Sequence, residues 1–149
     1  MSFNNPNIAK FFKAYQEVID KYNFPQKRIY NVDATGVSSV LNSPQIFAVT
    51  GKKQVGIVAG IERGIHVTVV CCIKPIGNHI PPTFIFAKKK WKPDLLEGAP
   101  TASLGFSQES GWITGEIFLK WLKHFQKFSY ATKESLILLG LDGHISHKN

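Results

Sequence analysis

The chain has few cysteines and no long hydrophobic segment. Its two cysteines, Cys71 and Cys72, are adjacent in the sequence. Successive strand side chains point to opposite faces, so these thiols cannot readily bond to each other or grip one metal ion. We expect both to be packing residues, in a protein of a reducing compartment. No apolar run approaches the roughly 20 residues of a membrane-spanning helix, and the N-terminal residues do not have the pattern of a secretory signal.

Acidic residues are also scarce. The 149 residues include 10 acidic and 18 basic side chains, which gives a net charge of +8 and a pI near 9.6. Such an excess attracts nucleic acid through the release of counterions, although a basic protein with no such partner has a similar balance. The length suffices for one domain with a hydrophobic core. Nucleic acid is therefore the leading partner, and no membrane is expected.

Two amphipathic helices are predicted. Near the N-terminus, apolar residues recur at helical spacing from Ile8 to Tyr22, with Asn5 as the N-cap and Pro6 in the first helical position. Such a wide apolar face must dock on this domain or on a neighbouring one. The second helix is predicted to begin after Thr114 as its N-cap. Its apolar face includes Trp121, and a basic face contains Lys120, Lys123, His124 and Lys127.

The rest of the chain alternates short apolar runs with turns. Several short strands joined by turns favour antiparallel pairing. The run Ile65–Ile73 is nearly all apolar and β-branched, which predicts a central strand buried on both faces. Residues 88–111 are predicted to form an irregular connection, and Trp112 and Trp121 are assigned to the core. The predicted strands are Arg28–Asp33, Val55–Gly60, Ile65–Ile73, Pro82–Phe86 and Leu136–Asp142.

Asp33 and Asp142 each end one of these apolar runs. A crossover helix before the last strand would return the chain parallel to the first strand, so both aspartates would emerge at the same edge of the sheet. Two such carboxylates could share a divalent cation such as Mg²⁺, an arrangement suited to cutting or joining a phosphodiester. The alternative is that both are ordinary turn residues, because aspartate favours strand ends.

Basic residues cluster in two places that could contact DNA. Lys52 and Lys53 form one turn, and Lys88, Lys89, Lys90 and Lys92 surround Trp91. A basic loop with an aromatic ring can hold a DNA backbone and stack a base. The same run could be a solvated surface or a nuclear-import signal. His144 and His147 would orient Asp142 or contact phosphate; zinc ligation is the alternative.

Short motifs follow one another along residues 28–147. They are Asn31–Gly36, Gly51–Val55, Glu62–Gly64 with Val67–Cys72, Gly77–Asn78 before Ile80–Pro82, Phe84–Phe86, Gly98–Pro100, Ser110–Trp112, and Leu141–His144 with Ser146–His147. Each motif alone is weak, but in this order they resemble the DDE endonuclease domain of pogo-, Tigger- and jerky-type transposases.

This resemblance implies an α/β, ribonuclease-H-like mixed sheet with flanking helices, in a nuclear protein that cuts and transfers DNA strands with Mg²⁺ or Mn²⁺. Asp33 and Asp142 match the family's first two catalytic aspartates and would hold the metal. The chain departs from the family because residues 143–149 contain no third carboxylate, and Ala34 and Gly143 replace the usual glutamate and asparagine. We therefore expect residues 1–25 to be a lead-in helix and residues 26–149 to be a truncated endonuclease domain. Its C-terminal part would be missing, and it would be inactive or reused for DNA or protein binding.

Overall fold

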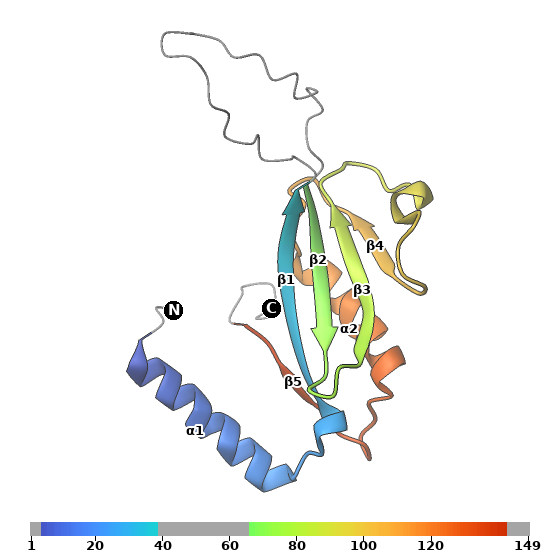
Figure 1. The fold of residues 1–149 in the computed structure, drawn as a ribbon. Coiled ribbons are helices and arrows are strands. Elements are labelled where there is room, and N and C mark those ends of the chain that lie inside the picture. Colours follow the sequence, from blue (N-terminus) through green and yellow to red (C-terminus); the bar gives the residue numbers. More distant parts are fainter. Residues whose placement is uncertain (1–3, 39–65, 143–149) are drawn as a thin grey trace, which may run out of the picture.

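A computed structural model describes residues 4–38 and 66–142 of the chain. A five-stranded mixed sheet in the order β4-β3-β2-β1-β5 forms its centre (Figure 1). Neighbours among β1, β2 and β3 are antiparallel, whereas β4 runs parallel to β3 and β5 runs parallel to β1. The strands are β1 Ile29–Ser38, β2 His66–Ile73, β3 His79–Phe86, β4 Leu104–Ser107 and β5 Leu138–Gly140.

Helix α2, Gly115–Ser129, packs on one face of the sheet and builds the core with it (Figure 1). Trp121 is almost fully buried, and the ring of Phe125 meets Tyr30 of β1 edge to face at a centroid distance of 5.0 Å. Val32 of β1 and Val70 of β2 are buried in the same core. The predicted apolar face of this helix is thus confirmed, because burying it removes the largest rings in this part of the chain from water.

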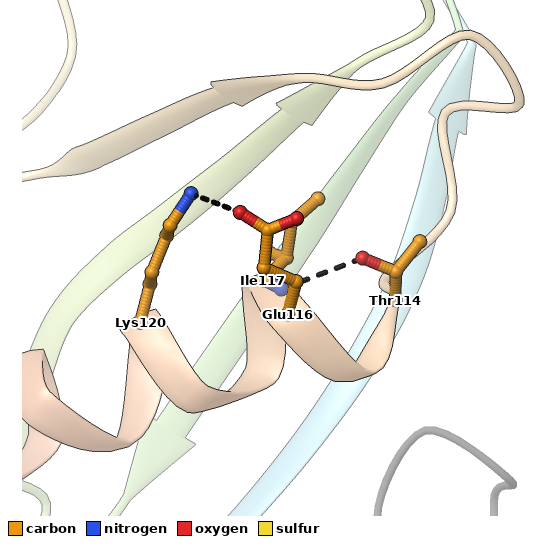
Figure 2. A network of polar contacts seen from close by, with 4 residues as sticks. All are labelled: Thr114, Glu116, Ile117 and Lys120. Atoms are coloured by element: carbon orange, nitrogen blue, oxygen red, sulfur yellow. Dashed lines mark hydrogen bonds and ion pairs between the residues drawn. The ribbon is translucent and has the colours of Figure 1, made fainter.

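Side-chain bonds fix the first turn of α2 (Figure 2). The Thr114 hydroxyl oxygen accepts a hydrogen bond from the backbone N–H of Ile117 at 3.4 Å, which confirms the predicted N-cap. Glu116 forms an ion pair of 2.6 Å with Lys120, one turn later. The hydrogen bond from Lys120 lowers the pKa of Glu116 below its ordinary value. The start of the helix is therefore determined by residues within its own first two turns.

Helix α1, Asn5–Tyr22, stands away from the sheet on the side of β5 (Figure 1). Its N-cap is Asn4, which accepts a hydrogen bond from the backbone of Asn7, so the predicted cap at Asn5 was wrong by one residue. No residue of α1 is buried, and the exposed fraction of Phe11 is 59%. A groove of about 590 Å³ separates the helix from β1 and β5. The predicted apolar face is therefore only half-buried at Tyr15, Val18 and Ile19, and it is exposed at Ile8, Phe11, Phe12 and Tyr22.

The predicted first strand was too short. β1 continues past Asp33 to Ser38, so the chain does not turn at Thr35 and Gly36, where the sequence led us to expect a turn after Asp33. The reason lies in the partner strand, because β2 pairs with β1 from Asn31 through Ser38. Hydrogen bonds from a long neighbour keep a glycine extended where the local sequence favours a turn. Asp33 consequently lies inside a strand.

Three further predictions on this sheet were wrong in part. β2 is buried on one face only, so Cys72 is buried as expected but Cys71 is exposed. The stretch expected to be irregular contains β4 and a short 3-10 helix, Pro93–Leu96. Trp112 was assigned to the core and is 59% exposed. The two errors in burial arose because burial depends on which elements cover a face, and β4 was missed because its pairing with β3 is not visible in the local sequence. The predicted strand Val55–Gly60 and its flanking turns lie outside the described residues.

Candidate functional site

Asp33 and Asp142 line the same small cavity. The parallel register pairs Ile29 with Leu138 and Asn31 with Gly140, and each aspartate lies two residues beyond the latter pair. The predicted parallel pairing of the two aspartate-bearing segments is therefore confirmed, although β5 is shorter than predicted. The cavity measures about 70 Å³, which leaves space for a few water molecules. Its other lining residues are Val32, Ala34, Val70, Trp112, Ile113 and Phe118.

Strand geometry holds Asp33 in place. Alternation along β1 buries Tyr30 and Val32 and leaves Asn31 and Asp33 exposed. The carboxylate oxygen Oδ1 of Asp33 accepts a hydrogen bond of 2.8 Å from the backbone N–H of Ala34. This bond restricts the side-chain rotamer, and the second carboxylate oxygen is not part of it. The Asp33 carboxylate, on the strand next to the edge strand β5, therefore has a defined orientation.

The segment before α2 forms the opposite wall of the cavity, through Trp112 and Ile113. Gly111 turns the chain there with a φ of +73°. The buried hydroxyl of Thr68 donates a hydrogen bond of 2.7 Å to the carbonyl of Gly111. A Cβ at Gly111 would also lie 3.0 Å from the Cβ of Ala87. Close packing and this bond therefore hold the wall against β2 and β3.

Trp112 was not identified as a site residue from the sequence. Its motif, Ser110–Trp112, was quoted only for the family resemblance, and a tryptophan is assigned to the core by default. The signal that could have located it is the adjacent Gly111, because a glycine often marks a turn or a close approach of the backbone. A half-exposed indole next to two aspartates gives the cavity a large apolar wall.

The donor set suits a hard cation. Asp33 and Asp142 offer carboxylate oxygens, the ligands that Mg²⁺ and Mn²⁺ prefer, and such ions keep several waters or bind phosphate in addition. Within residues 4–38 and 66–142, no group of three or more His, Cys, Asp or Glu side chains could hold a metal ion. The described residues therefore supply two carboxylates at this cavity, the type of donor that such a cation would need. His144 and His147 lie outside the described residues.

The basic loop Lys88–Lys92 lies elsewhere, between β3 and the 3-10 helix, and contributes no residue to the cavity lining. Trp91 packs against Phe86 at a centroid distance of 6.2 Å and remains 41% exposed. Nζ of Lys89 lies 3.9 Å from Oε1 of Glu109, and both side chains are largely exposed. The second predicted basic turn, Lys52 and Lys53, lies outside the described residues. The structure thus brings the two aspartates together and leaves the loop apart from them.

Comparison with known proteins identifies the family. Residues 65–149 match the model of the DDE superfamily endonuclease. The chain belongs to this family. The mixed five-stranded sheet with flanking helices is consistent with the ribonuclease-H-like fold of DDE domains, so the predicted fold class is confirmed.

The chain is also similar to a curated protein named MFS-type transporter clz9, from Cochliobolus lunatus. The two are 31% identical over 131 residues, which cover 85% of this chain and 14% of the relative. The chain thus spans only a small part of that protein's length. In the described residues, no helix is both long and apolar enough to cross a membrane. No solved structure matches the chain.

Proposed function

We propose that this chain is a transposase-type DNA endonuclease domain in which Asp33 and Asp142 hold a divalent cation. The observation that carries this proposal is the parallel pairing of β1 and β5, which leads both aspartates to one cavity in a chain of the DDE endonuclease family. The family implies a nucleic acid substrate, and the net charge of +8 suits one. The pogo-, Tigger- or jerky-type subclass belongs to this proposal.

Asp33 and Asp142 would act as metal ligands. The bound ion, Mg²⁺ or Mn²⁺, would supply activation of a water or hydroxyl for attack on a phosphodiester. The backbone N–H of Ala34 restrains one carboxylate oxygen of Asp33, and the other oxygen would be available to a cation. Trp112 and Phe118 give the cavity an apolar surface beside the two carboxylates.

DNA contact is assigned to the basic loop. Lys88, Lys89, Lys90 and Lys92 would bind phosphates, and the exposed part of the Trp91 ring would meet a base or a sugar. Lys52 and Lys53 are proposed to add to this surface. Binding should be weak, show little sequence preference and fall steeply with salt concentration, because phosphate contacts supply the affinity. A nuclear location is part of the same proposal.

These 149 residues are not expected to cut DNA by themselves. Related sites use three carboxylates, and the sequence after Asp142 contributes none. With two carboxylates the charge of the bound cation is less well balanced. A longer protein that includes this chain would have to supply the third carboxylate. The second candidate function is that of a transposon-derived module that binds DNA or protein without cleaving it, and it is favoured by Ala34 and Gly143, which replace the glutamate and asparagine usual in related sites.

A supercoiled-plasmid nicking assay in Mg²⁺ or Mn²⁺ tests the proposal, together with Mn²⁺ binding followed by electron paramagnetic resonance. The parent chain should bind Mn²⁺, and Asp33→Ala and Asp142→Ala should each weaken that binding. Asp20→Ala, on the exposed helix α1, is the matched control and should not. We expect no nicking by the parent. Nicking by the parent that disappears in Asp33→Ala would contradict the proposed inactivity and support the site. Mn²⁺ affinity that is unchanged in both Asp33→Ala and Asp142→Ala would refute the site.

A further inference from the structure

The guanidinium of Arg28 joins three segments of the chain. It donates three hydrogen bonds to backbone carbonyl oxygens. Nη1 donates to Ser129 at 3.2 Å, Nε donates to Leu136 at 3.1 Å, and Nη2 donates to Ser135. Ser129 is the last residue of α2, and the other two carbonyls lie in the connection that leads to β5. One side chain next to the start of β1 therefore binds both the end of α2 and the approach to β5.

The segment that Arg28 binds leads into β5, a strand that has few contacts of its own to fix its register. Among the described residues, β5 is an edge strand of three residues, and its register with β1 consists of the pairs Ile29–Leu138, Tyr30–Leu139 and Asn31–Gly140. Strands this short are at the low end of the usual range and have few backbone hydrogen bonds to resist slipping. A slip of one residue would turn every side chain of the strand to the other face.

The position of Asp142 depends on that register. Arg28 lies immediately before Ile29, the first residue of β1 to pair with β5, and Asp142 follows two residues after the last pair. The planar guanidinium is suited to this task because its donors form a rigid fork, whereas a lysine ammonium is a point charge that sets no orientation. The hydrogen bonds of the Arg28 guanidinium therefore affect where Asp142 lies relative to Asp33.

We propose that Arg28 is a positioning residue for the metal site: it fixes the register of β5 against β1 and so sets Asp142 beside Asp33. This inference rests on the proposed function for the role of the aspartates, but the effect of Arg28 on β5 does not. The competing explanation is a purely local one, in which the positive charge only stabilises the C-terminal end of α2.

The first measurement needs no metal. Hydrogen exchange of the 149-residue chain is followed by mass spectrometry in the parent, Arg28→Gln, Arg28→Lys and the control Lys27→Gln, which loses the same charge one residue away. Peptides covering residues 136–142 should exchange at least about tenfold faster in Arg28→Gln, as expected when charge-assisted hydrogen bonds are lost. Arg28→Lys should show an intermediate rate, and Lys27→Gln should match the parent. Faster exchange confined to α2 would overturn the proposal in favour of the local explanation.

The second measurement is the Mn²⁺ affinity of the same variants. Loss of a residue that orients a metal ligand weakens metal binding by about 10- to 100-fold, and we expect a decrease in this range for Arg28→Gln. A disulfide between Ile29→Cys and Leu138→Cys, at facing register positions, would then replace the lost restraint. This crosslink should restore Mn²⁺ affinity to Arg28→Gln when oxidised and lose the effect when reduced.

The two measurements separate the possible failures. If the parent binds no Mn²⁺ at the aspartates while β5 still exchanges faster in Arg28→Gln, the proposed function fails and the structural part of this inference stands. If the parent binds Mn²⁺ through Asp33 and Asp142 but Arg28→Gln binds it equally well, the positioning role is refuted. Failure of the oxidised crosslink to restore affinity refutes it also, as does an equal loss in Lys27→Gln. If Arg28→Gln does not fold, Arg28→Lys carries the same comparison.

Discussion

Gly105 in β4 lies directly beneath the indole of Trp91. A Cβ built at this glycine would be 2.1 Å from Cη2 and 2.7 Å from Cζ3 of that ring, and 3.0 Å from Cδ1 of Leu96. Carbon atoms in contact are normally about 3.5 Å apart or more, so Gly105→Ala must displace the indole by more than about 1 Å. Because Trp91 is 41% exposed, the ring can swing towards solvent. The substitution should therefore unpack the basic loop Lys88–Lys92 while the sheet stays intact.

The expected cost is that of overpacking, about 1–3 kcal/mol in the free energy of unfolding, measured by urea denaturation. A double-mutant cycle isolates the cause. In a Trp91→Ala background the collision is gone, so Gly105→Ala should cost only a small fraction of that amount. Gly36→Ala in β1 is the matched control, since a Cβ there meets nothing within 4 Å. Equal costs for Gly105→Ala with and without Trp91 would refute the reasoning.

Three further predictions concern the core, the thiols and the first turn of α2. Trp121→Ala should destabilise the domain by about 3–5 kcal/mol in urea unfolding, because this ring is 1% exposed at the centre of the core. Burial raises the pKa of the Cys72 thiol to about 12, so a thiol reagent at neutral pH should label Cys71 in the native chain and both cysteines only after unfolding. The pKa of Glu116 is lowered in the folded state, so its stabilising contribution is present above the ordinary carboxyl pKa and is lost as pH falls through the folded value. Thermal melts between neutral and acid pH should show a smaller acid-induced decrease in Glu116→Gln than in the parent; an equal decrease would contradict this assignment.

Local pattern was sufficient for much of the architecture. The periodicity of Ile117, Trp121 and Phe125 predicted α2 and its buried face, and Thr114 marked its start, because helix spacing and capping act within a few residues. The order of strands, helix and strand also predicted the parallel pairing of β1 with β5, since a crossover connection has few alternatives. The aspartate pair follows from that topology. The domain boundary at residue 25 and the catalytic role of the pair stay predictions.

Other features depend on contacts between distant segments. β4 has four half-buried residues and no alternation, so only its pairing with β3 reveals it as a strand. β1 extends through Gly36 because β2 lies alongside, and Trp112 lines the cavity beside the aspartates instead of packing in the core. Arg28 showed no pattern at all in the sequence, since its three carbonyl partners lie about a hundred residues away. Helix periodicity and capping depend on residues close together in the sequence and can be predicted from it. Strand pairing and the burial of each face are determined only when the whole sheet assembles.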